Sequence, residues 1–536
     1  MCGIFALIGN AETLDPEVVQ TSFEKGKKRG PELSQLNRYN QNYIGFHRLA
    51  INGVTNGSQP FEIGDYVLVC NGEIYNYKEL IADHNLTMTT QSDCEVILHL
   101  YAIFGKDCIQ KLDGEFAFIL YDRVRDLFFI GRDQYGVRPL YINFSNGFCL
   151  CSDLEPMKCM DIQKATQFTP GTYMFIEKGQ EKYYITEKEG YSKVLPTILA
   201  NKTEYLYNIY ALLCRAVIKR VENSERPVAC LLSGGLDSSL VAAIAARHLR
   251  EQGKVLETYS IGLEGSEDLK YAQIVADHIG SKHTQIVSTE DDFINSIPDV
   301  VRDIESYDTT TIRASVGNWN VGKYIRQHSD AKIILNGDGS DELIGGYLYF
   351  AKAGSATEFD IETRRLLKNI SYFDVLRSDK SISSHGLEPR TPFLDTHFTE
   401  YCLRIPPSVR FHKGIHDKQE KYLFREAFEM IAPELLPKIV LWRVKEGLSD
   451  GLSSLQRSWY KIIQERVKEM NLPDQNYEIN PPTTQEQKYY RYLYHQYYDS
   501  NTTPYFWMPK YTNATDPSAR TLDFYKSLNN IKIELK

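Results

Sequence analysis

The hydrophobic and polar positions of this chain follow two different patterns. Up to about residue 190, short apolar or alternating runs are separated by turn residues, as in YVLVCNGEIYNY, GEFAFILYD, DLFFIGRD and GFCLCSD. Runs of this kind are typical of strands, and here they predict a layered, mostly antiparallel β domain over residues 2–190. The segment SDCEVILHLYAIFG instead has the periodicity of a helix.

From about residue 203 the pattern becomes an alternation of buried strand and helix. PVACLL precedes SGGLDSSLVAAIAARHL, VLETYSIGL precedes DLKYAQIVADHIG, and AKIIL precedes NGDGSDELIGGY. This order predicts an α/β domain with a parallel sheet over residues 203–510, helical after about residue 350. Residues 511–536 are polar and weakly patterned, which predicts a mobile tail. The linker EKEGYSKVLPTILANKT at 187–203 separates the two domains.

Composition narrows the class of protein. With 42% hydrophobic and 24% charged residues the chain is globular, and 536 residues indicate two or three domains. A net charge of -9 argues against a nucleic-acid or anionic-membrane partner. No run of about 18 apolar residues and no signal peptide are present, so we expect a cytoplasmic protein. The ten cysteines form no paired CxxC array, which predicts buried thiols rather than a zinc site or disulfides.

The second residue, Cys2, is a candidate nucleophile. Removal of Met1 would place a thiol and a free α-amine on one residue. A thiol with a pKa of about 8.5 is mostly protonated at neutral pH, whereas an α-amine with a pKa of about 7.7 to 8.0 can accept its proton. Taken alone, Cys2 is better explained as a small residue that follows the initiator.

Five motifs downstream of Cys2 change that interpretation. They are RGPE at 29–32, FHRLAI at 46–51, CNGEIYNY at 70–77, SDCE at 92–95 and GRDQYGVRPLY at 131–141. In this order they resemble the class II glutamine amidotransferase domain, an N-terminal-nucleophile hydrolase fold that releases ammonia from glutamine. The resemblance implies that Cys2 is the nucleophile and that Asn71 and Gly72 donate to the oxyanion. It also implies that Arg48 binds the glutamine carboxylate and that Glu73 and Asp93 bind its α-ammonium. Ile51 and Asn52 would make further contacts with glutamine. Lys28 and Glu32 stand where the family usually has His and Asp, which leaves the order of that loop open.

The string LLSGGLDSS at 231–239 follows a buried strand and opens a helix, so its amides and the helix dipole face an anion. It lacks the Gly-Lys-Ser/Thr ending of a Walker loop and resembles the PP-loop of ATP pyrophosphatases. The resemblance implies a pyrophosphate cradle of Ser233, Gly234, Gly235, Ser238 and Ser239, with Mg²⁺ on Asp237 and adenine between Leu231 and Ile261.

Segments after this loop indicate which group of ATP pyrophosphatases the chain resembles. YDTTTIRAS, NGDGSDELIGGYLYF, YFDVLRSDKSIS, EPRTPFLD and WRVKEGLSDG follow in order from residue 307 to 451. With the N-terminal motifs they resemble the glutamine-hydrolysing asparagine synthetases over nearly the whole chain. The resemblance implies ATP and Mg²⁺, the substrates glutamine and aspartate, a β-aspartyl-AMP intermediate, a passage for ammonia and a homodimer. It implies that Lys445 and Arg313 stabilise negative charge on the phosphates and that Asn336 and Gly337 contact the nucleotide. Thr310, Thr311 and Glu342 would contact the acyl-adenylate, and Asp374 would be a second metal ligand.

The segment NGDGSDE departs from the family, which usually has Ser and Glu where Asn336 and Asp338 stand. A Glu at position 338 is thought to guide or deprotonate the ammonia. Asp is shorter by one methylene, about 1.5 Å. We expect synthetase turnover to fall by up to about a hundredfold, because a misplacement of about 1 Å costs that much, while glutaminase activity is unaffected.

Two alternatives remain open from sequence. One is a relative that amidates or cyclises another carboxylate, as β-lactam synthetases do, although those lack the catalytic N-terminal Cys. The other is a sensor that binds glutamine or nucleotide without turnover. Release of pyrophosphate from ATP in the presence of aspartate distinguishes a synthetase from a sensor.

Overall fold

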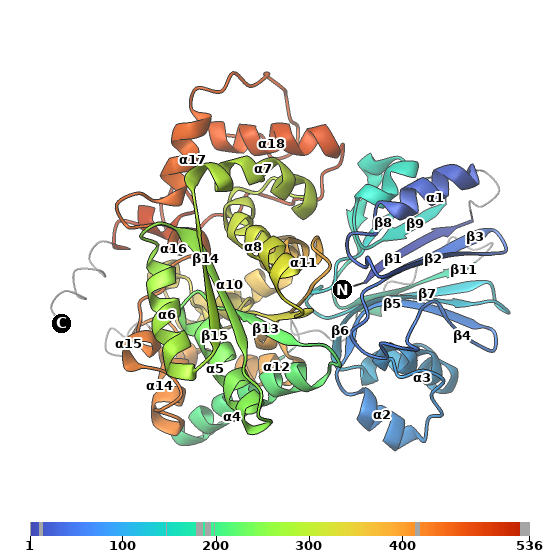
Figure 1. The fold of residues 1–536 in the computed structure, drawn as a ribbon, viewed down its shortest axis with the longest axis horizontal. Helices are drawn as coiled ribbons and strands as arrows, with labels where there is room; N and C mark the ends of the chain where they lie inside the picture. Colours follow the sequence, from blue (N-terminus) through green and yellow to red (C-terminus); the bar gives the residue numbers. More distant parts are fainter. Residues whose placement is uncertain are drawn as a thin grey trace.

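The computed structural model describes residues 2–9, 14–145, 147–177, 186–187, 194–197, 199–412 and 419–525. Most of the predicted linker at 187–203 therefore lies outside the described residues. The chain forms two lobes side by side, and its N-terminus lies where they meet (Figure 1). We call residues 2–187 the N-terminal lobe and residues 199–525 the C-terminal lobe.

The N-terminal lobe is a sandwich of two antiparallel sheets. The first has the order β10-β8-β9-β1-β3-β2 and the second the order β12-β11-β7-β6-β5-β4. The first sheet consists of β1 (Gly3–Ile8), β2 (Leu33–Tyr39), β3 (Asn42–Arg48), β8 (Tyr141–Asn143), β9 (Phe148–Cys151) and β10 (Thr166–Gln167). The second consists of β4 (Phe61–Ile63), β5 (Tyr66–Ile74), β6 (Gly114–Asp122), β7 (Leu127–Arg132), β11 (Thr172–Glu177) and β12 (Thr186–Glu187).

Alternation along the strands explains these layers. Ile4 and Ala6 of β1 pack against Val67 and Val69 of β5 between the sheets. The intervening Phe5 faces outward toward α1 (Pro16–Glu24). On the outer face of the second sheet lie α2 (Tyr77–His84) and α3 (Val96–Phe104), packed on the other side of β5. The predicted antiparallel layered domain is confirmed, and its predicted helix is α3 with a short 3₁₀ turn before it.

The C-terminal lobe is built on a parallel sheet with the order β15-β14-β13-β16-β17. Its strands are β13 (Val228–Leu231), β14 (Glu257–Leu263), β15 (Lys282–Ser288), β16 (Ile333–Leu335) and β17 (Glu388–Arg390). Ile333 and Leu335 pack on the face covered by α4 (Lys202–Glu222), α5 (Leu236–Glu251) and α6 (Glu267–Ile279). Ile334 packs on the face covered by α7 (Glu290–Ile304), α8 (Thr309–His328) and α11 (Asp374–Ser383). The predicted α/β arrangement is confirmed.

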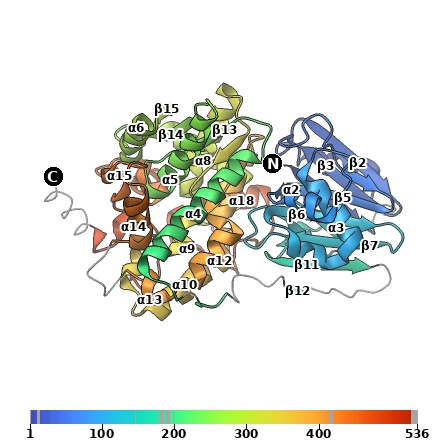
Figure 2. The same ribbon diagram turned by 90° about the horizontal axis from the view of Figure 1, so that it is seen from below.

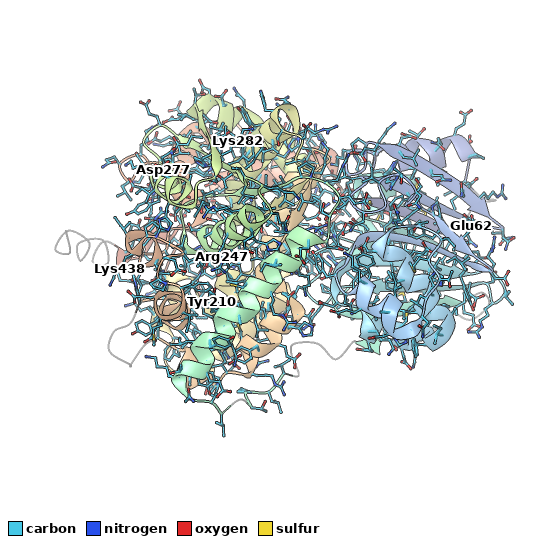
Figure 3. The ribbon with its side chains drawn as sticks, turned by 60° about the horizontal axis from the view of Figure 1, so that its bottom comes forward. Glu62, Tyr210, Arg247, Asp277, Lys282 and Lys438 are labelled. Carbon is cyan, nitrogen blue, oxygen red and sulfur yellow. The ribbon has the colours of Figure 1, made fainter. Side chains whose placement is uncertain are left out.

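Helix α4 runs across the face of the C-terminal lobe, and its C-terminal end meets the N-terminal lobe (Figure 2). It packs on α5, where the Arg247 guanidinium lies 5.9 Å from the ring centroid of Tyr210 (Figure 3). The remaining helices are α9 (Ser340–Ile344), α10 (Ala356–Asn369), α12 (Thr396–Arg404), α13 (Pro407–Arg410), α14 (Tyr422–Ile431), α15 (Lys438–Leu441), α16 (Leu448–Gly451), α17 (Trp459–Val467) and α18 (Gln485–Tyr497). None of the helices in the described part of the chain is both long and apolar enough to span a membrane.

The first half of the predicted tail packs on the C-terminal lobe. Asp516 pairs with Arg313 (2.7 Å), and the Ser518 hydroxyl donates to Asp450 (2.6 Å). Arg520 donates to the Ser454 carbonyl (2.8 Å). Residues 511–525 thus belong structurally to this lobe, whereas residues 526–536 lie outside the described residues.

Candidate functional site

Cys2 lies directly before β1, at the boundary between the lobes. Its N–H donates to Asn71 Oδ1 (3.1 Å), and its thiol lies 3.6 Å from the Leu49 carbonyl. Arg29 Nε donates to the Cys2 carbonyl (3.0 Å). Burial raises the pKa of the Cys2 thiol to about 11, so the thiol needs a base to become a nucleophile.

Asn71 on β5 contacts Cys2 from the opposite sheet, and Gly72 is the next residue of that strand. Asn71 is fully buried, and its amide Nδ2 has no hydrogen-bond partner within the described part of the structure. Such an unpaired donor is costly unless a ligand uses it. A Cβ at Gly72 would lie 2.4 Å from the Glu115 carbonyl, so only glycine fits there. Asn71 therefore offers a free donor next to Cys2, as an oxyanion site requires.

Glu73 and Asp93 are buried carboxylates beside the same strand. Glu73 Oε2 accepts from Asn52 Nδ2 (2.7 Å), and Asp93 Oδ2 accepts from the Ile74 N–H (2.6 Å). Burial raises the pKa of Glu73 well above its ordinary value and that of Asp93 to about 6. A bound ammonium group would counter this desolvation, which fits the predicted role of both carboxylates.

Arg48 and Ile51 shape the loop in front of the thiol. The Arg48 guanidinium donates to the carbonyls of Gly53 (2.5 Å) and Val54 (3.2 Å) and to the Ser58 hydroxyl (3.3 Å). Ile51 is buried in the lobe interface. In this structure Arg48 orders the 53–58 loop, and a substrate carboxylate would use its remaining donors.

The two departures in the neighbouring loop both have partners. Glu32 accepts from the Ala50 N–H (2.8 Å) and pairs with Arg226 (2.6 Å). Lys28 pairs with Asp303 of the C-terminal lobe (3.0 Å). The loop is therefore held by contacts that suit Lys and Glu.

A cavity of about 180 Å³ opens at the carboxyl ends of β13 and β16 in the C-terminal lobe. This is the edge at which parallel α/β sheets bind ligands. Of the predicted site residues, the following line it: Leu231, Ser233, Gly235, Asp237, Ser238, Thr310, Asn336, Gly337, Asp338, Asp374 and Lys445. Thr311 and Glu342 line a smaller adjoining cavity, which shares Thr310 and Asp374 with the first.

The loop before α5 has the form of an anion cradle. The hydroxyls of Ser233 and Ser238 lie 3.0 Å apart, and Gly235 caps the helix. Gly234 has a φ of +69°, and a Cβ there would lie 2.4 Å from the Ala272 amide nitrogen. Ser239 is buried one residue further along the helix, and its hydroxyl has no partner among the described residues. Amides at such a helix start favour phosphate.

Two lysines neutralise the acidic groups of this cradle. Lys421 Nζ contacts both Asp237 oxygens (2.7 and 2.6 Å) and Asp341 (2.6 Å). Lys445 Nζ contacts Asp341 (2.5 Å) and lies 3.8 Å from Asp237. Although burial raises it, the pKa of Asp237 is held below its ordinary value by these lysines. Lys421 was missed by sequence reasoning, because QEKYLF resembles any helix start.

Asp338 and Asp374 share one arginine at the other end of the cavity. Arg377 Nη2 lies 3.0 Å from Asp338 Oδ1 and 3.0 Å from Asp374 Oδ1. Asp338 Oδ2 is buried without a hydrogen-bond partner among the described residues, and burial raises the pKa of Asp338. The Tyr347 hydroxyl bridges Glu342 and Asp374 Oδ2, the latter at 2.8 Å. Asn336 donates to the Ser378 hydroxyl (2.6 Å).

Arg313 and Ile261 lie elsewhere than their predicted roles require. Arg313 is buried on α8 with its guanidinium between Glu486 (2.6 Å) and Asp516 (2.7 Å), and it is not among the cavity lining. The Ile261 side chain packs toward α7 and α8 and lines a separate groove. The guanidinium donors of Arg313 are already used by the two carboxylates, so its side chain is not directed at the phosphate cradle. The alternation of β14 turns the Ile261 side chain away from the cavity that Leu231 lines, where it was predicted to flank adenine.

Comparison with known proteins agrees with both halves of this geometry. The family described as glutamine amidotransferase domain matches residues 1–186, and the family described as asparagine synthase matches residues 208–360 and 351–498. A relative named asparagine synthetase [glutamine-hydrolyzing] from Homo sapiens is 41% identical over 566 residues. The alignment covers 98% of this chain and 99% of that relative. The chain belongs to the asparagine synthetase family.

Relatives of the same name from other vertebrates show similar agreement. Those from Rattus norvegicus and Gallus gallus are each 40% identical, over 564 and 566 residues, again covering 98% of this chain and 99% of the relative. The family resemblance predicted from the motifs is confirmed.

Proposed function

We propose that this protein is a glutamine-hydrolysing asparagine synthetase with a glutaminase domain over residues 2–190 and a synthetase domain over residues 203–510. The observation that carries the proposal is one chain with two complementary sites. In the N-terminal lobe, Cys2 contacts Asn71, whose amide donor is unpaired among the described residues, and a phosphate cradle opens in the C-terminal lobe.

The glutaminase half-reaction starts at Cys2. The α-amine of mature Cys2 takes the thiol proton, and the sulfur attacks the amide carbon of glutamine. Asn71 Nδ2 and the Gly72 N–H stabilise the oxyanion. The α-amine returns the proton to the leaving nitrogen, ammonia departs, and water then hydrolyses the thioester to glutamate. Glu73 and Asp93 bind the substrate α-ammonium.

The synthetase half-reaction takes place in the cavity. An aspartate β-carboxylate oxygen attacks the α-phosphorus of ATP, and the bond to the bridging oxygen of pyrophosphate breaks. Ser233, Gly235 and Ser238 hold the pyrophosphate, while Lys421 and Lys445 compensate its charge. Ammonia then attacks the acyl carbon, AMP leaves, and asparagine forms.

The residues present suit Mg²⁺ as well. The cavity offers carboxylate oxygens from Asp237 and Asp374, and Mg²⁺ is commonly bound by one or two carboxylates together with substrate phosphates. Asp237 is held ionised by its lysine neighbours, as a carboxylate ligand of such a cation would have to be. Such an ion would neutralise negative charge on the phosphates.

The same family resemblance leads us to propose a homodimeric, cytoplasmic enzyme and a passage for ammonia between the lobes. A protected passage is physically reasonable, because ammonia is mostly protonated in water at pH 7 and exclusion of water protects reactive intermediates. Sedimentation of the purified protein tests the dimer.

The test of this function is release of pyrophosphate. Wild-type protein with ATP, Mg²⁺, aspartate and ammonium should form pyrophosphate, AMP and asparagine in equal amounts, and omission of aspartate should stop all three. A protein that binds ATP but releases no pyrophosphate under these conditions would be a sensor, and the proposal would be wrong.

A further inference from the structure

Strand β17 belongs to the ATP-binding sheet, yet it reaches the glutamine site of the other lobe. Its Arg390 pairs with Leu335 of β16 in the parallel register, at the edge of the sheet. Arg390 Nη2 lies 3.1 Å from Glu73 Oε2 in the N-terminal lobe. A residue of the synthetase half thus touches a carboxylate that the proposed function assigns to glutamine.

Arg390 is held rigidly for this contact. Its side chain is fully buried, and Nε donates to Glu388 Oε1 (2.8 Å). Nη1 donates to the carbonyls of Arg220 (2.6 Å) and Asn223 (2.8 Å) at the end of α4. A planar guanidinium with this many fixed donors has few alternative orientations, so Nη2 is held within ion-pair distance of Glu73 before any substrate binds, although it makes no hydrogen bond among the described residues.

All hydrogen bonds and ion pairs of Glu73 in the described structure fall on one oxygen, Oε2. It accepts from Asn52 of its own lobe (2.7 Å) and from Asn223 of the C-terminal lobe (2.9 Å), and it faces Arg390. This arrangement fixes the carboxylate and leaves Oε1 to a ligand. Two of these three partners come from the synthetase half.

We propose that Arg390, assisted by Asn223, is a positioning residue of the glutamine site, which the synthetase half supplies to orient Glu73 toward the substrate α-ammonium. The inference rests on the proposed function and adds that the glutaminase site is incomplete without the other lobe. Arg390 touches neither the thiol nor the scissile amide, so its effect passes through Glu73.

The positive charge of Arg390 also favours the ionised form of Glu73. Glu73 is buried and faces Asp93 on the 3₁₀ turn before α3 and Glu388 on β17, which both disfavour its ionised form. Arg390 and Arg138 oppose them. Without Arg390, Glu73 takes up a proton at higher pH, and a neutral carboxyl no longer pairs with an ammonium group.

Arg390 also joins this site to the nucleotide cavity through its main chain. Its carbonyl accepts from the Asn336 N–H (3.2 Å), and Asn336 lines the cavity. Strand β17 therefore lies between the glutamine site and the loop that carries Asp338.

The experiment compares Arg390→Gln, Arg390→Lys and Asn223→Ala with a control, Lys219→Gln. Lys219 pairs with Asp113 across the same interface (2.6 Å) but does not contact Glu73. Glutamine hydrolysis is measured from pH 6 to 9, and asparagine synthesis is measured with glutamine and, separately, with ammonium.

We expect R390Q to raise KM for glutamine at least about tenfold with a smaller change in kcat, and to shift the acid limb of kcat/KM to higher pH. R390K should recover part of the loss, and N223A should raise KM less. Ammonium-dependent synthesis should stay near the wild-type rate, as should every rate of K219Q.

Two results would overturn the inference. One is a KM for glutamine within about twofold of wild type in both R390Q and N223A. The other is an equal loss of glutamine-dependent and ammonium-dependent synthesis in R390Q and N223A, which indicates a structural role. Failure of the wild-type protein to make asparagine at all would instead refute the proposed function.

Discussion

At the scale of single residues, the glutaminase site combines a hard-to-ionise nucleophile with donors that lack partners. The Cys2 thiol has a raised pKa because it is buried, and Asn71 Nδ2 is buried without a partner among the described residues. Both features are unfavourable in the free protein. When glutamine is bound, the unpaired Asn71 donor can meet the negative charge that develops on the substrate oxygen as the thiol attacks.

Replacement of Asn71 tests this directly. We expect Asn71→Ala to lower kcat for glutamine hydrolysis by about 10²- to 10³-fold, the usual cost of losing one oxyanion donor. Ammonium-dependent synthesis should be unchanged, since it does not use the thiol. Steady-state glutamate formation measures the effect, with Cys2→Ala as the inactive reference. A fall of less than about fivefold would exclude Asn71 from the oxyanion site.

The carboxyl of Asp93 predicts a pH dependence. Burial raises its pKa to about 6, so Asp93 is ionised above this pH and protonated below it. Because kcat/KM reports the free enzyme, glutamine hydrolysis should fall as pH decreases through about 6, as the ammonium ligand loses its charge. A titration of initial rates from pH 5 to 8 measures this. An unchanged kcat/KM down to pH 5 would contradict the assignment.

The departure at position 338 gives a gain-of-function prediction. Oδ1 of Asp338 pairs with Arg377, and Oδ2 lacks a hydrogen-bond partner in the described structure. We expect Asp338→Glu to raise coupled asparagine synthesis, by up to about a hundredfold if reach alone limits the rate, and to leave glutaminase activity unchanged. Equal turnover of D338E and wild type would mean that the shorter side chain costs nothing here.

At the scale of elements, α11 connects the two sites. Its first turns place Asp374, Arg377 and Ser378 at the cavity. Midway along the helix, Asp379 pairs with Arg29 (2.9 Å), whose Nε donates to the Cys2 carbonyl. One helix therefore contacts groups that the proposed function assigns to both half-reactions.

Arg313 on α8 has a structural role in this arrangement. It is buried, and it pairs with the buried Glu486 on α18 and with the partly buried Asp516. Because Asp516 still pairs with Arg313, Glu486→Gln removes only the charge-assisted hydrogen bonds of Glu486, and it should destabilise the fold by about 1.5–3 kcal/mol. Thermal unfolding measures this, with Asp474→Asn, an exposed partner of Lys488, as control. If Tm is the same for both variants, the Arg313 cluster is not structural.

The sequence predicted the elements well because strand alternation and the strand-loop-helix order of the cradle are local patterns. Cys2, Asn71, Asp237 and Asp338 were found because each lies in a compact motif. Lys421 and Arg390 were not assigned, since their roles arise from contacts with residues far away in the chain: Lys421 with Asp237, and Arg390 with Glu73. Tertiary packing alone decides such pairs.

Arg313, by contrast, was assigned a role from its motif that its contacts do not support. Its motif suggested a phosphate ligand, whereas Glu486 and Asp516 saturate its guanidinium. A motif preserves the position of a residue in the fold, but the direction of its side chain depends on partners from other segments. The predicted tail illustrates the same point, because Asp516 belongs to it.

At the scale of the whole molecule, the boundary between the lobes is a buried network of charges. Arg138 of the N-terminal lobe pairs with Glu115 (3.1 Å) and donates to the Pro389 carbonyl (3.0 Å). Arg220 of the C-terminal lobe pairs with Glu115 (2.8 Å) as well. Fixed, desolvated pairs of this kind set one relative position of the lobes, which keeps the thiol and the nucleotide cavity in register.

We propose that nitrogen released at Cys2 becomes the amide of asparagine without leaving the protein. The most direct measurement supplies amide-¹⁵N glutamine, aspartate, ATP, Mg²⁺ and an excess of unlabelled ammonium, and follows the label in asparagine by mass spectrometry. We predict that labelled asparagine dominates in the wild type and disappears in Cys2→Ala, which still makes unlabelled asparagine. Label diluted to the level of the bulk ammonium pool would contradict the account.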